Sequence, residues 1–116
     1  MVRHMPNQSM RLNRVFQALA DPTRRAVLER LSSGPAAMGE LAQPFDMALP
    51  SFSQHLDVLE DCGLVRSSKT GRVRTYRLSP RPLKVAEHWM AVQRAIWGRR
   101  LDQLDDFLKD LKEKKR

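Results

Sequence analysis

Residues 51–79 constrain the fold more than any other part of the chain. Apolar residues at helical spacing run up to Gly63, and a glycine is the usual residue just past the end of a helix. Two short strands follow, with a turn around Thr70-Gly71. No Asp or Glu occurs from residue 63 to residue 86, whereas the strand pair carries five basic residues. These are Arg66, Lys69, Arg72, Arg74 and Arg77. A helix with a polar face followed by an acid-free basic hairpin is typical of a winged helix-turn-helix, and predicts a surface for DNA.

Periodicity predicts four more helices, so the expected fold class is mainly α with a small β-hairpin. The first helix has its apolar face at Leu12, Val15, Phe16 and Leu19. A second helix is expected over residues 22–31, with Asp21 as its N-cap because that carboxylate can accept from the first free amides. A third, over residues 37–45, should end at Pro44.

The fourth helix, over residues 50–61, completes the helix-turn-helix with the third, and its predicted buried stripe is Phe52, Leu56 and Leu59. Pro80 and Pro82 should break the chain before a fifth helix at about residues 83–112.

The fifth helix is too long for a domain of this size to cover, at roughly 45 Å for 1.5 Å per residue. Its apolar residues alternate spacings of four and three, with a phase shift at Ile96-Trp97, which favours a partner helix. We therefore expect a homodimer through the terminal helices; the alternative is a helix that folds back on its own domain. The predicted interface comprises Leu12, Phe16, Trp89, Val92, Ile96, Trp97, Leu101, Leu104 and Leu108.

The polar face of the fourth helix is expected to enter the major groove. Gln54 is the best candidate for reading a base, since its amide can pair bidentately with adenine. Ser51 and Ser53 suit short-range contacts to bases or phosphates. His55 lies nearer the buried stripe, and two interpretations stay open: a phosphate contact, or a half-buried residue with one satisfied nitrogen. The wing should act through Lys69, Arg72 and Arg74, which flank the turn and can contact phosphates or a narrow minor groove.

The length and charge of the chain agree with a single domain that has a modest hydrophobic core. The chain has 116 residues and a net charge of +8, which favours polyanionic partners. One cysteine excludes an internal disulfide and suits the cytoplasm. No apolar run approaches the ~20 residues of a membrane span. We expect a flexible leader over residues 1–10, the domain over residues 11–111 and a frayed basic tail over residues 112–116.

Three motifs resemble the ArsR/SmtB family of winged-helix repressors. These are ALADPTRRAVL at residues 18–28, LPSFSQHLDVLEDCGLV at residues 49–65 and GRVRTYRL at residues 71–78. The similarity covers about residues 12–108. It implies a homodimer on a two-fold symmetric operator, usually repressing transcription. The run IWGRRLDQL at residues 96–104 resembles a subgroup without obvious metal sites.

The chain departs from the metal-sensing members of that family. Their paired cysteines in the third helix are replaced by ELAQP at residues 40–44, and Glu87-His88 has no second histidine to complete a site on the last helix. No metal or cofactor is therefore expected. Ala48 stands where the family has a serine N-cap, which should weaken the helix start by about 1 kcal/mol.

Cys62 is expected to be structural, because Glu60 and Asp61 would raise the pKa of its thiol. No catalytic constellation is apparent, so an enzyme is not expected. Two alternatives to a repressor stay open: a protein-interaction module built on a winged helix, and a nonspecific nucleic-acid binder. The sequence does not indicate an effector, an operator or the regulated genes.

Overall fold

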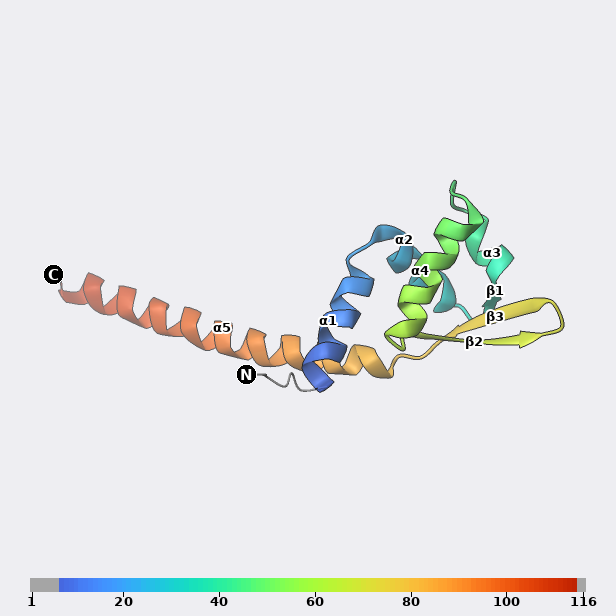
Figure 1. The fold of residues 1–116 in the computed structure, drawn as a ribbon. Helices are drawn as coiled ribbons and strands as arrows, with labels where there is room; N and C mark the ends of the chain where they lie inside the picture. Colours follow the sequence, from blue (N-terminus) through green and yellow to red (C-terminus); the bar gives the residue numbers. More distant parts are fainter. Residues whose placement is uncertain (1–6, 115–116) are drawn as a thin grey trace, which may run out of the picture. The chain divides into compact units, whose positions relative to one another are not determined.

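The computed structural model describes residues 7–114. The chain forms two compact units, one ending at Ala86 and the other beginning at Glu87. The predicted domain over residues 11–111 spans both. The elements follow in the order α1 (Asn7–Leu19), α2 (Pro22–Leu31), β1 (Ala36–Ala37), α3 (Met38–Ala42), α4 (Leu49–Asp61), β2 (Val65–Thr70), β3 (Val73–Leu78) and α5 (Arg81–Lys114) (Figure 1).

The helix starts follow the caps that the sequence predicted. Asp21 caps α2: its Oδ2 accepts from the Arg24 amide at 3.0 Å, and Pro22 opens the helix. Ala48, before α4, makes no side-chain capping bond, as expected for alanine. Gly63 follows the end of α4 with φ +83°, the left-handed region that glycine reaches without a Cβ clash. α3 ends at Ala42, before Pro44, so its end lies three residues earlier than that of the predicted helix over residues 37–45.

Three further boundary predictions are wrong. Pro82 does not break the chain, because it is the second residue of α5, where the amide would have no partner inside the helix. Residues 7–10 belong to α1 rather than to a leader, and residues 1–6 lie outside the described part. Residues 112–114 continue α5, whose last turn carries Lys112 and Lys114, cations that suit the negative end of a helix dipole. Residues 115–116 lie outside the described part.

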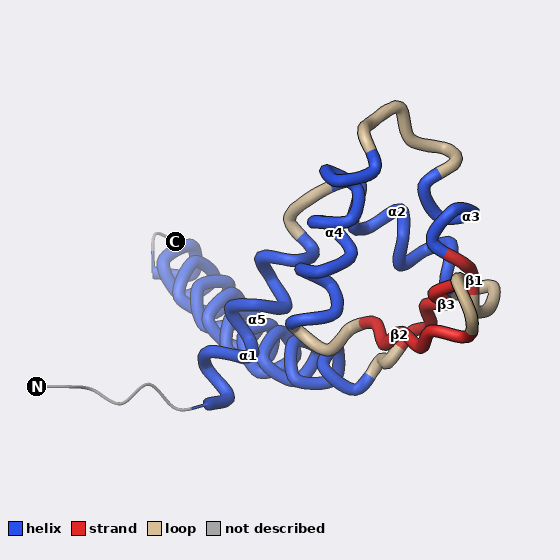
Figure 2. The backbone as a smooth tube through the Cα atoms, turned by 45° about the vertical axis from the view of Figure 1, so that its right-hand side comes forward, coloured by secondary structure: helices blue, strands red, loops and turns tan. Residues whose placement is uncertain are grey.

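The sheet has a third strand, β1, which the sequence pattern does not predict. All pairings are antiparallel and the strand order is β1-β3-β2 (Figure 2). Ala36 lies opposite Tyr76, and Ala37 lies opposite Thr75. β1 consists of two alanines, which are too few to show the alternation of a strand. The strand is recognisable only from its pairing with β3.

The core of the first unit lies between its helices and this sheet. Its buried side chains include the predicted stripe of α4, which is fully covered, and the rings of Phe45 and Phe52 lie 5.4 Å apart. The buried core residues are Val15, Ala18, Val27, Leu31, Ala36, Leu41, Phe52, Leu56, Leu59, Leu64, Val65, Tyr76 and Ala86. The core therefore fixes which face of α4 points outward.

Candidate nucleic-acid interface

The outer face of α4 carries polar side chains along its length. Ser51, Gln54 and Asp57 are exposed, while Ser53 is partly buried. This arrangement follows from the helical period, since Phe52, Leu56 and Leu59 turn the opposite face into the core. Gln54, the residue predicted to contact a base, is therefore exposed on the outer face of α4.

The hairpin of β2 and β3 forms the wing. Its register pairs Thr70 with Val73, which leaves the two-residue loop Gly71-Arg72. Gly71 has φ +63°, the positive φ that tight hairpin turns require. The predicted basic residues Lys69, Arg72 and Arg74 are all exposed at this end.

Two hydrogen bonds connect the wing to α4, and no sequence pattern predicts them. Arg74 Nη1 donates to Ser67 Oγ at 2.9 Å, and Ser67 Oγ donates to Glu60 Oε2 at 2.7 Å. Burial raises the pKa of the Tyr76 phenol nearby, and the carboxylates of Glu60 and Asp57 raise it further. Glu60 in α4 therefore holds one cation of the wing through a serine hydroxyl.

His55 contacts two side chains of its own unit, Arg24 and Asp21. Its Nδ1 lies 3.1 Å from Arg24 Nη1 and 3.6 Å from Asp21 Oδ2. A guanidinium has donors only, so the shorter contact is a hydrogen bond in which Nδ1 accepts and the proton of the neutral ring is on Nε2. The Asp21 contact becomes an ion pair only when the ring is protonated. His55 is thus half-buried with one satisfied nitrogen, as in the second interpretation, and Nδ1 is the nitrogen used, which leaves the phosphate contact of the first interpretation to Nε2.

Arg24 joins three helices at this point. Besides His55 of α4, its guanidinium donates to the carbonyls of Ala18 at 2.9 Å and Gln17 at 2.8 Å, at the end of α1. Although partial burial alone would raise the pKa of Asp21, the Arg24 and Thr23 amides and the Arg24 charge hold that pKa below its usual value, and His55 adds to this effect only when its ring is protonated. Arg24, in the motif at residues 18–28, therefore connects the end of α1 to α4.

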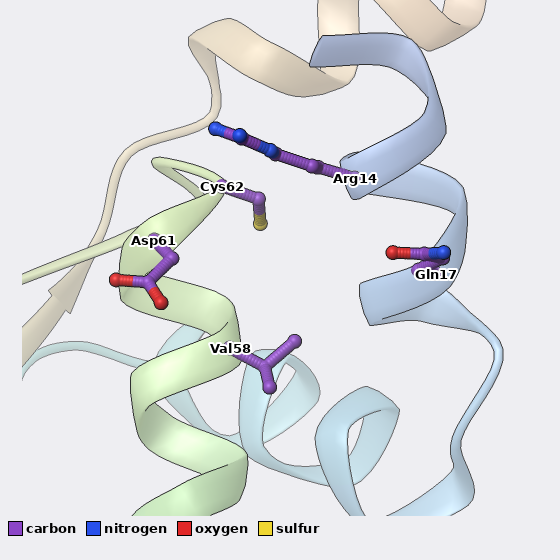
Figure 3. A pocket seen from close by; sticks show the side chains of 5 residues that line it. All are labelled: Arg14, Gln17, Val58, Asp61 and Cys62. Atoms are coloured by element: carbon purple, nitrogen blue, oxygen red, sulfur yellow. The ribbon is translucent and has the colours of Figure 1, made fainter. Parts of the chain in front are cut away.

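An open pocket of about 410 Å³ lies between α1 and the last turns of α4 (Figure 3). Arg14 and Gln17 line one side; Val58, Asp61 and Cys62 line the other. The Cys62 thiol points into it and donates to the Leu59 carbonyl at 3.3 Å. Burial, and secondarily the Asp61 charge, raises the pKa of Cys62, in the predicted direction.

The predicted interface residues of α5 are mostly uncovered. Trp97 and Leu101 are 60% and 64% exposed, and Trp89, Val92, Leu104 and Leu108 are also exposed, whereas Ile96 is partly buried. Met90 and Phe107, which the sequence analysis left out, are exposed apolar residues of the same helix. In the first unit, Leu12 and Phe16 are partly buried against the core.

Within residues 7–114, no three His, Cys, Asp or Glu side chains cluster closely enough to hold a metal ion. None of the helices in that part of the chain is long and apolar enough to span a membrane.

The helix pair α3–α4, the three-stranded sheet and the basic hairpin define a winged helix-turn-helix protein. A family described as a helix-turn-helix domain matches residues 19–68. A solved structure of an ArsR family transcriptional regulator superposes with a TM-score of 0.76 and 53% identity, covering 84% of this chain and 97% of that one. The chain belongs to the ArsR family of transcriptional regulators.

Two curated relatives are named as a transcriptional regulator and a transcriptional repressor. The chain is 34% identical over 79 residues to the transcriptional repressor SdpR of Bacillus subtilis. The matched region covers 68% of this chain and 88% of SdpR. It is 50% identical over 68 residues to the HTH-type transcriptional regulator Rv2034 of Mycobacterium tuberculosis, which covers 59% of this chain. The match spans 64% of that regulator's length, less than two thirds.

A further solved structure is a homodimeric winged helix-turn-helix DNA-binding domain from Mycobacterium bovis. It has 27% identity and a TM-score of 0.59, and the match covers 83% of this chain and 90% of that domain.

Proposed function

We propose that this protein is a transcriptional repressor that binds a two-fold symmetric DNA operator as a homodimer in the cytoplasm. The observation that carries the proposal is the pairing of an outward polar face on α4 with an adjacent basic wing, in a segment without acids from residue 63 to residue 86. Repression is supported by the relation to SdpR, named a transcriptional repressor. We assign it no catalytic activity and no cofactor.

The recognition helix supplies the base contacts in this proposal. Gln54 pairs with adenine through its amide, and Ser51 and Ser53 contact bases or phosphates at short range. His55 donates from Nε2 to a phosphate oxygen, because Arg24 occupies Nδ1. Ser51 and Gln54 are exposed and Ser53 and His55 partly so, which leaves all four within reach of a groove.

The wing supplies sequence-independent affinity. Lys69, Arg72 and Arg74 bind phosphates at the edge of the operator, and each phosphate neutralised adds about 0.9 to the slope of log affinity against log salt. The relay through Ser67 to Glu60 holds Arg74 at a fixed place relative to α4.

The second chain of the dimer covers the exposed apolar face of α5. The homodimeric M. bovis domain supports this assembly. A helix that left Trp97 and Leu101 in water would forgo roughly 1.5–3 kcal/mol for each side chain. A dimer also places two recognition helices on one duplex, which explains the proposed two-fold operator.

Selection of bound duplexes from a random DNA library tests this function. We expect the wild-type protein to enrich a two-fold symmetric sequence. The Gln54→Ala variant should lose preference at one position in each half-site, with about 1–3 kcal/mol less discrimination there. Enrichment of no sequence, despite binding, would indicate a nonspecific nucleic-acid binder. Absence of binding would instead favour the protein-interaction module.

A further inference from the structure

The register of the wing places like charges opposite each other. Of the six residue pairs between β2 and β3, two consist of two cations: Arg66 with Arg77, and Lys69 with Arg74. Directly opposed like charges destabilise a strand pair. The hairpin therefore keeps two unfavourable pairs that another anion could relieve.

The two pairs lie on opposite faces of the hairpin. Side chains alternate along a strand, so Lys69 and Arg74 share a face with Ser67 and the buried Tyr76. That face is turned toward α4, since Ser67 donates to Glu60. Arg66 and Arg77 must then lie on the reverse face, and both are exposed.

Only one of the two pairs has an anion of its own. Arg74 reaches the Glu60 carboxylate through Ser67. Within residues 7–114, no ion pair or hydrogen bond connects Arg66 or Arg77 to a carboxylate, and the local sequence supplies none between residues 63 and 86. The reverse-face pair is thus a pair of guanidinium groups that lacks an anion within the described chain.

We propose that Arg66 and Arg77 form a second anion-binding surface, which binds phosphates of the operator duplex on the outer side of the wing. This proposal rests on the proposed DNA-binding function. Guanidinium groups match phosphate oxygens in a bidentate geometry, and a hairpin lying along a duplex has phosphates on both of its sides. The wing then contacts DNA with two faces. The reverse-face pair does so at the base of the hairpin, whereas Lys69 and Arg74 lie beside its turn.

Nested duplexes separate the two faces. The selected operator is shortened from both ends in steps of two base pairs, and the slope of log affinity against log salt is measured for each length. The variants are Arg66→Gln/Arg77→Gln and, as the matched pair on the other face, Lys69→Gln/Arg74→Gln. On long duplexes each double variant should lower the slope by about two units per hairpin.

The lengths at which these losses vanish decide the proposal. We expect the effects of the two double variants to disappear at different duplex lengths, because one pair lies at the base of the hairpin and the other beside its turn. Loss of both effects at the same length, or no effect of Arg66→Gln/Arg77→Gln at any length, would overturn it. If wild-type protein binds no duplex, the proposed function fails first, and the result is recognisable as such.

Two controls keep a folding defect apart from a lost contact. Arg66→Lys/Arg77→Lys keeps both charges and should retain the slope to within about half a unit, because the salt dependence counts charges. Arg66→Gln/Arg77→Gln removes a repulsion, so its melting temperature should stay the same or rise. A lower slope accompanied by a lower melting temperature in both variants would assign the pair a structural role and contradict the proposal.

Discussion

The two compact units differ in how far their apolar side chains are buried. Up to Ala86, side chains such as Phe52, Leu56 and Leu59 have no exposed surface. From Glu87 onward, Trp97, Leu101 and Phe107 keep 58–64% of theirs exposed. Both units show apolar residues at helical spacing, yet only the first contains several helices and a sheet that can cover one another. Periodicity thus shows that a helix has an apolar face; a second element must exist to cover that face.

For the second unit, we propose that the covering element is the same helix of another chain. The difference between the units then has a thermodynamic consequence. The stability of the first unit should be independent of protein concentration, whereas coverage of α5 should follow mass action. Four variants test this contrast, the dimer contact and the polar contacts of the first unit.

The largest effect is expected from Leu101→Ser/Leu104→Ser/Leu108→Ser in α5. Each leucine contributes roughly 1.5–3 kcal/mol when buried, so the dimer dissociation constant should rise by more than a thousandfold. Sedimentation velocity should show a monomer at micromolar concentration, while circular dichroism keeps the strand and helix signals of the first unit. Gln103→Ser/Asp106→Ser on the same helix is the control and should remain dimeric. A triple variant that still dimerises would place the interface elsewhere.

The core substitution Leu56→Ala should lower the free energy of unfolding by about 2–5 kcal/mol. Leu56 is fully buried, so the loss should be equal at every protein concentration. Leu104→Ala is the matched exposed leucine, and its effect in urea denaturation should fade on dilution. Equal, concentration-independent losses in both variants would show that α5 packs against its own chain.

Arg24→Ala should cost about 2 kcal/mol, because hydrogen bonds from a charged group contribute more than neutral ones. Three of the contacts of this guanidinium hold α1 and α4 together. Arg24→Lys should restore little, as an ammonium cannot reproduce the planar fork. Arg25→Ala removes an exposed donor to the Leu19 carbonyl and should cost under about 1 kcal/mol. Full rescue by lysine would show that only the charge of Arg24 matters.

The smallest effect is expected at Asp21. Asp21→Ala should destabilise by about 1 kcal/mol at neutral pH, and Asp21→Asn by less, since asparagine also caps helices. The pKa of Asp21 is lower in the fold than in the unfolded chain. Its stabilisation is therefore present above the unfolded value, about 3.9, and is lost as pH falls through the folded pKa. Urea denaturation between pH 6 and pH 3 should show the wild type and Asp21→Ala converge; a constant difference would exclude this linkage.

Much of the first unit was accessible from the sequence. Asp21, Gly63 and the stripe of Phe52, Leu56 and Leu59 are local signals, and the structure confirms them. The break predicted at Pro82 was wrong because the first turn of a helix tolerates proline. β1 was invisible because two alanines acquire their structure only from β3.

The polar contacts between elements of the site were harder to predict from the sequence. The relay from Glu60 through Ser67 to Arg74 and the contact of Arg24 with His55 connect residues 7 to 31 positions apart. The side chains that make them have no local pattern, since hydroxyl, carboxylate and guanidinium groups also serve as ordinary surface residues. Strand register and helix packing bring them together, and neither can be read from spacing alone.

Binding to the DNA upstream of the protein's own gene tests the central claim most directly. Fluorescence anisotropy would compare that promoter with a shuffled duplex of equal length and composition at two salt concentrations. Our account predicts binding to the promoter that weakens steeply with salt, with much weaker binding to the shuffled duplex. Equal binding to both would place the operator elsewhere or indicate nonspecific binding. No binding to either duplex at low salt would contradict the account.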